Sequence, residues 1–226
     1  METISAANLC VKKFDPWFGC TKVSPGCDNC FPEQWDRILD NQCWGDNPRK
    51  MATDREWRAP LKWNENAKAK GIYYKVNCAF ECDWADEQVP DSSRDRLWQL
   101  IRNTPHLRWH LLTKRASLIA SYLPADWDSG YHNVSLGVSV ENVQHGVQRI
   151  DILRGIPAHE RFIYFAPLLE NLGDLNLAGI NCVHVLGEMG KGRRPMKKEW
   201  AKRIRLQCQQ QGVEFIDIDN VLKAAA

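Results

Sequence analysis

Short apolar segments alternate with longer amphipathic segments along most of this 226-residue chain. Most of the short segments carry apolar residues at successive positions, which is typical of strands buried on both faces of a parallel sheet. These segments span residues 72–78, 109–113, 133–138, 161–165, 182–186 and 214–218. With a further strand at 11–14, the pattern predicts about six to seven mainly parallel strands.

The longer segments have the spacing of amphipathic helices. Helices are predicted at residues 91–103, 116–123, 143–154 and 197–211. Regular alternation of strands and helices predicts βα units, which build either an open α/β sheet or a barrel. Because about seven strands fall short of an eight-stranded barrel, we expect an incomplete (β/α) barrel in one domain over residues 1–226. Residues 223–226 resemble a tag-like tail and are left out of this fold.

Polar residues gather directly after the predicted strands. In both α/β architectures the ligand site lies at the carboxyl edge of the strands, so these residues are candidates for one polar mouth. They are Glu81, Cys82, Asp83, Thr113, Lys114, Arg115, Ser139, Glu141, Asn142, Glu170, Asn171, Glu188, Arg193 and Arg194.

Three cysteines stand close together near the start of the chain. Cys20, Cys27 and Cys30 have the spacing C-x6-C-x2-C within a loop at 17–31 that is rich in turn residues. Such a loop can direct three thiolates at one place. Three soft thiolates without an equivalent fourth indicate an iron–sulfur cluster with one open iron or, less often, a zinc site. Polar turn residues around them argue against buried cysteines that act only as small apolar side chains.

Composition limits the cellular compartment and the class of protein. The nine cysteines are odd in number and no signal-peptide pattern precedes them, so we expect reduced thiols and a cytoplasmic protein. No apolar segment is long enough to cross a bilayer, which excludes a membrane-spanning protein. The formal net charge of +2 neither requires nor excludes a nucleic-acid partner. A basic segment at 191–205 is typical of either a phosphate-binding surface or a solvated helix face.

Five parts of the chain, in order, resemble a phage-borne three-cysteine-motif family related to radical S-adenosylmethionine (SAM) enzymes. The similar residues lie within 17–31, 112–115, 136–142, 161–169 and 187–196. Two features depart from the pattern. The cysteine spacing is longer than the C-x3-C-x2-C of most radical SAM enzymes. Ala166 also stands where the family often has an acid, which suggests a pocket adapted to another substrate.

The resemblance implies a partial barrel in which Cys20, Cys27 and Cys30 hold a [4Fe-4S] cluster and SAM chelates the open iron. One electron from a flavodoxin- or ferredoxin-like reductant cleaves SAM, and the resulting 5′-deoxyadenosyl radical removes hydrogen from a substrate. For a phage protein made in the bacterial host, the most specific expectation concerns hypermodified DNA. There the enzyme would isomerise glycine-modified thymidine from a nitrogen-linked to a carbon-linked form.

The resemblance also leads to candidate residues for binding the cofactor SAM. Ser139, Glu141 and Asn142 are suited to bind the ribose or the methionyl part of SAM, although Asn142 is equally suited to cap the following helix. Lys114 and Arg115 are candidates for the SAM carboxylate or a substrate phosphate, with a surface ion pair as the alternative.

Other residues are candidates for binding the substrate or reacting with it. Glu188 can accept a hydrogen bond from an ammonium group, and Arg193 and Arg194 can bind a phosphate or carboxylate of the substrate. Cys78 and Cys82 can return a hydrogen atom to a product radical, with packing in the core as the alternative.

Two other functions stay open from the sequence. One is a radical SAM enzyme that acts on a free small molecule or a peptide. The other is a non-catalytic zinc-binding nucleic-acid module, in which Cys43 or His110 completes four ligands.

Overall fold

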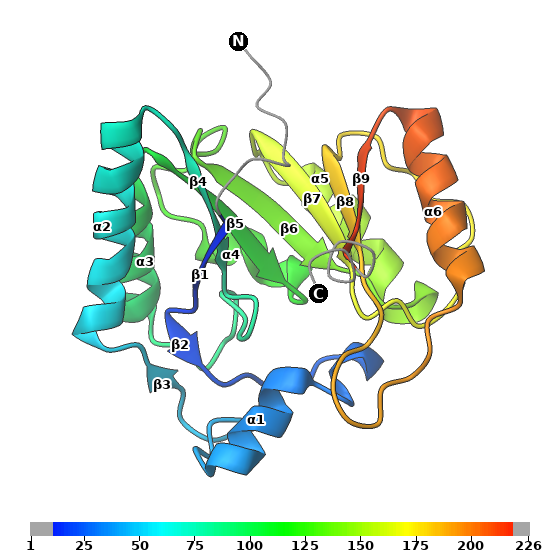
Figure 1. Cartoon of the computed structure of the whole chain (residues 1–226), viewed down its shortest axis with the longest axis horizontal. Helices are drawn as coiled ribbons and strands as arrows, with labels where there is room; N and C mark the ends of the chain where they lie inside the picture. The colour runs from blue at the N-terminus through cyan, green and yellow to red at the C-terminus, as the bar shows by residue number, and fades with distance from the viewer. Residues whose placement is uncertain (1–10, 219–226) are drawn as a thin grey trace.

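A seven-stranded parallel sheet organises the molecule. The structure, a computed structural model, describes residues 11–218, so the tail at 223–226 lies outside the described residues. The strand order is β1-β4-β5-β6-β7-β8-β9, and every neighbouring pair is parallel. The strands are β1 (Val11–Phe14), β4 (Tyr74–Cys78), β5 (Leu107–Thr113), β6 (Val134–Ser139), β7 (Glu160–Phe165), β8 (Cys182–Val185) and β9 (Glu214–Asp217). The sheet curls into a half-barrel, which confirms the predicted fold class (Figure 1).

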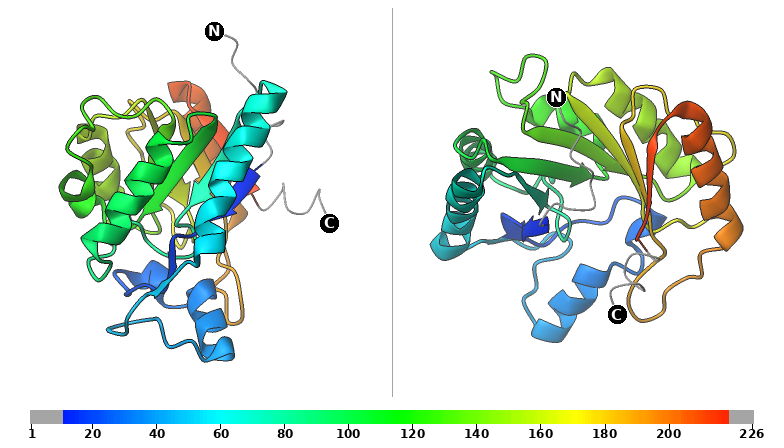
Figure 2. Two further views of the ribbon diagram at one scale, coloured as in Figure 1. Left: turned by 90° about the vertical axis from the view of Figure 1, so that its left-hand side faces the viewer. Right: turned by 45° about the horizontal axis from the view of Figure 1, so that its top comes forward.

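Helices cover the outer side of this curl (Figure 2). They are α2 (Asp54–Lys70), α3 (Asp91–Arg102), α4 (Ile119–Tyr122), α5 (Gln148–Gly155) and α6 (Lys198–Gln211). Two predicted helices each fall into two pieces, because a 3-10 turn at Ala116–Leu118 precedes α4 and a π-helical turn at Val143–Val147 precedes α5. Within residues 11–218, no helix has the length and apolar character needed to span a membrane.

Some elements were not predicted from the sequence. A short helix, α1 (Phe31–Leu39), follows the cysteine loop, and α2 is a full-length helix with a capping box at Thr53 and Glu56. The strands β2 (Trp17–Phe18) and β3 (Lys50–Met51) pair antiparallel outside the main sheet. Together these elements form the segment that carries the cysteines.

Aromatic rings fill the inner face of the half-barrel. Phe162 lies 5.1 Å from the ring of His110, and Tyr164 stacks on His184 at 4.7 Å between ring centroids. Gly137 on β6 makes room for the Phe162 ring, because a Cβ there would lie only 2.2 Å from the Phe162 Cζ. A glycine is therefore required sterically at this point of the sheet, away from any turn.

Replacing Gly137 with alanine is expected to lower the free energy of unfolding by about 1–3 kcal/mol, because the added methyl group overpacks the ring of Phe162. Denaturant unfolding followed by circular dichroism would measure this. Gly155→Ala is the matched control, since Gly155 ends α5 and nothing lies within 4 Å of a Cβ there. Equal effects of the two substitutions would contradict the steric account.

Candidate functional site

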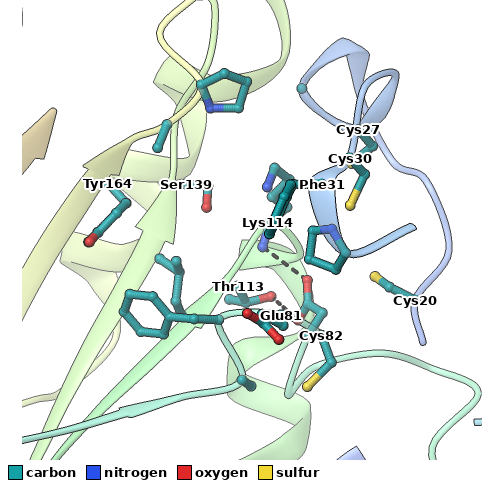
Figure 3. Close-up of a pocket in the computed structure, with 18 of the residues that line it drawn as sticks. Cys20, Cys27, Cys30, Phe31, Glu81, Cys82, Thr113, Lys114, Ser139 and Tyr164 are labelled. Carbon is teal, nitrogen blue, oxygen red and sulfur yellow. Dashed lines mark hydrogen bonds between the residues drawn. The ribbon is translucent and has the colours of Figure 1, made fainter. Parts of the chain in front are cut away.

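A cavity of about 410 Å³ opens at the carboxyl edge of the strands. The cysteine loop forms one wall, and the segments that follow β4, β5, β6, β7 and β8 form the others (Figure 3). Several predicted site residues line it: Cys20, Cys27, Cys30, Cys82, Lys114, Arg115, Ser139 and Glu188. The parallel topology therefore brings together side chains that are far apart in the sequence.

The three cysteines come from one irregular loop. Cys27 ends a 3-10 turn that begins at Pro25, and Cys30 is the N-cap residue of α1. Gly26 permits close packing on the sheet, because a Cβ there would lie 3.1 Å from Cγ of Glu141. All three cysteines border the cavity, and Figure 3 shows Cys27 and Cys30 side by side with Cys20 further along its wall.

Burial and nearby charges shape the chemistry of these thiols. Burial raises the pKa of Cys20 to about 12, a shift that Asp83 increases and Arg115 opposes. Burial also raises the pKa of Cys30. For Lys114, burial acts to lower the pKa, but Cys27, Glu141, Cys30 and Asp83 together raise it above its usual value. The Lys114 ammonium group therefore stays charged beside two of the three cysteines.

Asp83 and Arg115 form a buried ion pair that fastens the loop to the sheet. Arg115 Nη1 lies 2.9 Å from Asp83 Oδ2 and donates to Cys20 Sγ at 3.4 Å, while Nη2 donates to the carbonyl of Thr21 at 2.8 Å. Asp83 also accepts from Thr113 Oγ1 at 2.6 Å and from the Lys114 backbone N–H at 3.1 Å. The guanidinium of Arg115 is thus committed to the protein, and it is Lys114 that presents a charge to the cavity.

A second buried ion pair supports the far side of the loop. Arg49 Nε lies 2.6 Å from Asp86 Oδ2, and both side chains are almost fully buried. Arg49 also donates to Thr21 Oγ1 at 2.6 Å and to the carbonyl of Cys43 at 3.0 Å. Cys43 is therefore part of the framework that supports the loop, and it does not line the cavity.

Glu188 and Arg194, in the segment after β8, also hold the loop. Arg194 Nε donates to Glu188 Oε2 at 2.9 Å, and Arg194 Nη2 donates to the carbonyl of Pro25 at 2.8 Å. Asn29 Nδ2 donates to the same carboxylate at 3.0 Å. Burial acts to raise the pKa of Glu188, but the hydrogen bonds from Arg194 and Asn29 lower it below its usual value. Arg193 is exposed and lies outside the cavity lining.

Three other predicted site residues face away from the cavity. Glu141 is fully buried and pairs with Arg149, whose Nη1 lies 2.7 Å from Glu141 Oε2. Asn142 caps the helical turn that follows, accepting from the His145 backbone N–H at 2.8 Å. Cys78 is fully buried in the core. Of the residues named after β6, Ser139 alone lines the cavity, with its hydroxyl turned inward (Figure 3).

The comparisons with known proteins place the chain in a family. The model of a protein of unknown function, DUF5131, matches residues 5–217. The chain belongs to this family. Its fold is similar to that of a spore photoproduct lyase mutant solved with bound AdoMet and dinucleoside spore photoproduct, with a TM-score of 0.58. The similarity covers 91% of this chain and 75% of that chain at 11% identity. No curated protein matches.

The cavity of this DUF5131 chain also holds residues that the sequence analysis missed. Asn77, Phe80 and Tyr164 line it, and Asn77 Oδ1 is buried without a hydrogen-bond partner. The rings of Phe80 and Tyr164 meet edge to face at 5.3 Å. Alternation along β4 carried a signal for Asn77, because it lies between the buried residues Val76 and Cys78 and so points to the other face.

The free thiols of the described residues do not converge on a single point. Within residues 11–218, no three His, Cys, Asp or Glu side chains are arranged to hold one metal ion. His110, a candidate fourth zinc ligand, lies on the inner face of the half-barrel against Phe162 and outside the cavity lining.

Asp83→Asn is expected to lower the free energy of unfolding by about 3–5 kcal/mol, because it leaves the buried Arg115 guanidinium without its nearest countercharge. Asp174→Asn is the control, since Asp174 pairs with Arg203 on an exposed surface and is expected to contribute at most about 1 kcal/mol. Denaturant unfolding measures both, and limited proteolysis reports whether the 19–30 loop has loosened. A loss as small as that of Asp174→Asn would show that the buried pair does not fix the loop.

Proposed function

We propose that this chain is a radical SAM enzyme, in which Cys20, Cys27 and Cys30 hold a [4Fe-4S] cluster and SAM binds at the iron that they leave open. The observation that carries the proposal is the placement of three thiols from one loop on a cavity at the carboxyl edge of a parallel half-barrel. The fold neighbour, spore photoproduct lyase, has AdoMet bound.

The donor set fits this cluster better than it fits zinc. Thiolates are the usual protein ligands of iron–sulfur clusters. A four-iron cluster is larger than one ion, so its thiolates need not meet at one point, and the spread of the three cysteines is compatible with it. The zinc alternative needs a fourth ligand, yet neither Cys43 nor His110 lines the cavity.

A [4Fe-4S] cluster held by Cys20, Cys27 and Cys30, with SAM bound, would supply the difficult chemistry, which is reductive cleavage of SAM and removal of a hydrogen atom from the substrate. The chain provides binding and orientation. Lys114 and Ser139 line the cavity, and in this proposal the ammonium group of Lys114 holds the SAM carboxylate and the Ser139 hydroxyl binds a ribose hydroxyl. Enclosure of the cavity by the cysteine loop and by the segments that follow the strands limits the access of water to reactive species.

Anaerobic reconstitution with iron and sulfide tests the ligands. The wild-type protein is expected to turn brown, bind about four irons and release 5′-deoxyadenosine from SAM, because a thiolate-bound cluster performs this cleavage. Cys20→Ala, Cys27→Ala and Cys30→Ala are each expected to lose these properties, measured by absorbance, iron analysis and mass spectrometry.

Cys43→Ala is the matched control and is expected to keep the cluster, since Cys43 lies outside the cavity lining. Colourless wild-type protein that holds one zinc ion and loses it in Cys43→Ala would support the zinc module and exclude a radical SAM enzyme.

For the substrate, we propose glycine-modified thymidine in phage DNA, isomerised from the nitrogen-linked to the carbon-linked form in the host cytoplasm. Two features of the cavity and the ligand of the fold neighbour support a nucleobase as the substrate. Phe80 and Tyr164 present aromatic surface, Asn77 presents an unpaired polar group, and the fold neighbour contains a dinucleoside ligand. The exposed Arg193 is available to a DNA phosphate, whereas the guanidinium of Arg194 is held by Glu188 and Pro25.

Isomerisation leaves the oxidation state unchanged, so the hydrogen atom that is removed must be returned. Cys82 is suited to this step because it lines the cavity and its thiol donates a long hydrogen bond to Asp15 Oδ1 at 3.9 Å. Burial and the charge of Asp15 raise its pKa well above the usual value, so that Sγ keeps its hydrogen. Transfer of that atom to a substrate carbon radical forms a C–H bond and a thiyl radical, which one electron from the reductant and one proton restore.

Cys82→Ser is expected to retain the cluster and SAM cleavage but to raise the ratio of 5′-deoxyadenosine to isomerised product at least tenfold, because a hydroxyl is a much poorer hydrogen-atom donor than a thiol. Liquid chromatography with mass spectrometry of digested glycine-modified DNA measures the ratio. Cys182→Ser is the control, since Cys182 lies outside the cavity lining. An unchanged ratio in Cys82→Ser would assign the return of hydrogen to another group.

A further inference from the structure

The helix α1 has its polar and apolar sides reversed. Its two buried residues are acids, Glu33 and Asp36, with exposed fractions of 8% and 4%. Its large apolar residues Trp35, Ile38 and Leu39 are instead 45%, 71% and 61% exposed. A surface helix of a globular protein normally buries its apolar side, so this arrangement indicates that the apolar side has a partner.

Internal contacts account for the two acids. Asp36 accepts from the backbone N–H of Cys43 at 3.1 Å, and Glu33 pairs with Lys22 at 3.1 Å and with Arg37 at 2.7 Å. These contacts hold α1 with its acids inward. The outward position of Ile38 and Leu39 is therefore a fixed property of the fold.

The exposed side of α1 begins at the cysteine loop. Cys30 is the N-cap residue of the helix, and Phe31, the next residue, lines the cavity. The positions 31, 35, 38 and 39 share one face by helical spacing, and the rings of Phe31 and Trp35 meet edge to face at 5.9 Å. In Figures 1 and 2, α1 projects from the half-barrel away from α2 and α6. We call these four residues the α1 stripe.

Cations border the α1 stripe. Lys22 and Arg37 share the single carboxylate of Glu33 and remain 42% and 68% exposed, which leaves one net positive charge among the three groups. The loop at 190–192 packs beside Gln34 and adds Lys191, and Arg193 follows; both are exposed. The exposed acids beside the stripe are Asp28 and Asp40, and the acids Glu33 and Asp36 are buried, so cations outnumber acids among these exposed groups.

We propose that the α1 stripe is the docking surface for an acidic one-electron carrier protein, which reduces the cluster held by the adjoining loop. This inference rests on the proposed function, which needs such a reductant. A nine-residue helix with a basic border suits the small interfaces of electron-transfer complexes, in which charge guides the encounter. The two most exposed residues of the stripe, Ile38 and Leu39, are aliphatic and offer no surface for base stacking, which favours a protein over a nucleic acid as the partner.

Calorimetric titration with an acidic flavodoxin tests the docking surface without depending on catalysis. Wild-type protein is expected to bind, and Ile38→Glu combined with Leu39→Glu is expected to weaken the affinity at least tenfold by adding two like charges to the apolar contact. Leu206→Glu, at a 58% exposed position on α6, is the matched control and is expected to bind as the wild type does. Because all three positions are exposed, the substitutions leave the core intact.

Reduction assays separate this proposal from the function on which it rests. With dithionite as the reductant, the Ile38/Leu39 variant is expected to cleave SAM as fast as the wild type does. With flavodoxin as the reductant, the variant is expected to cleave SAM at less than one tenth of the rate of the wild type with flavodoxin. Failure of the wild type with dithionite would remove the proposed function but leave the calorimetric result standing. The docking proposal is overturned if flavodoxin does not bind, if both variants bind equally, or if the Ile38/Leu39 change instead abolishes self-association in sedimentation or binding of a DNA oligonucleotide.

Discussion

The buried ion pair of Asp83 and Arg115 fixes the geometry on which the rest of the site depends. The cysteine loop has little regular structure of its own: a two-residue strand, one 3-10 turn and the start of α1. Its position comes from Arg115, which joins Cys20 and Thr21 to the segment that follows β4. Charges buried at low dielectric tolerate few alternative arrangements, so this pair selects one position for the loop.

The ion pair of Glu188 and Arg194 is a second attachment of the loop. From the segment after β8, Arg194 donates to the carbonyl of Pro25, and Glu188 accepts from Asn29. The loop therefore spans the mouth of the half-barrel and is fastened at both ends of its span. The charged side chains of Asp83, Arg115, Glu188 and Arg194, which resemble catalytic groups in the sequence, attach the loop to the half-barrel. The predicted site residues that line the cavity without this role include Cys82, Lys114 and Ser139, and Asn77, Phe80 and Tyr164 line it as well.

The strands could be predicted almost to the residue because parallel strands under helices carry continuous apolar runs. Helix α2 was missed because Pro60 interrupts its pattern, and β2 and β3 are too short to leave one. For the site, the cysteine loop and the carboxyl edge could be predicted from turn residues and topology. The direction of the side chains could not be predicted. Glu141 turns away from the cavity into the protein interior because Arg149, on the following helix, compensates its charge.

Helix α1 shows why some surfaces cannot be predicted from the hydrophobic pattern of the sequence. Periodicity identifies which residues share a helix face, but the assignment of that face to the core assumes that apolar residues are buried. Here the acids Glu33 and Asp36 bind Lys22 and the backbone of Cys43, and these contacts decide which way the helix turns. The contact between Glu33 and Lys22 also joins α1 to the loop that carries Cys20 and Cys27. Because Cys30 is the N-cap residue of α1, the contacts that orient the helix also help to fix the position of this cysteine.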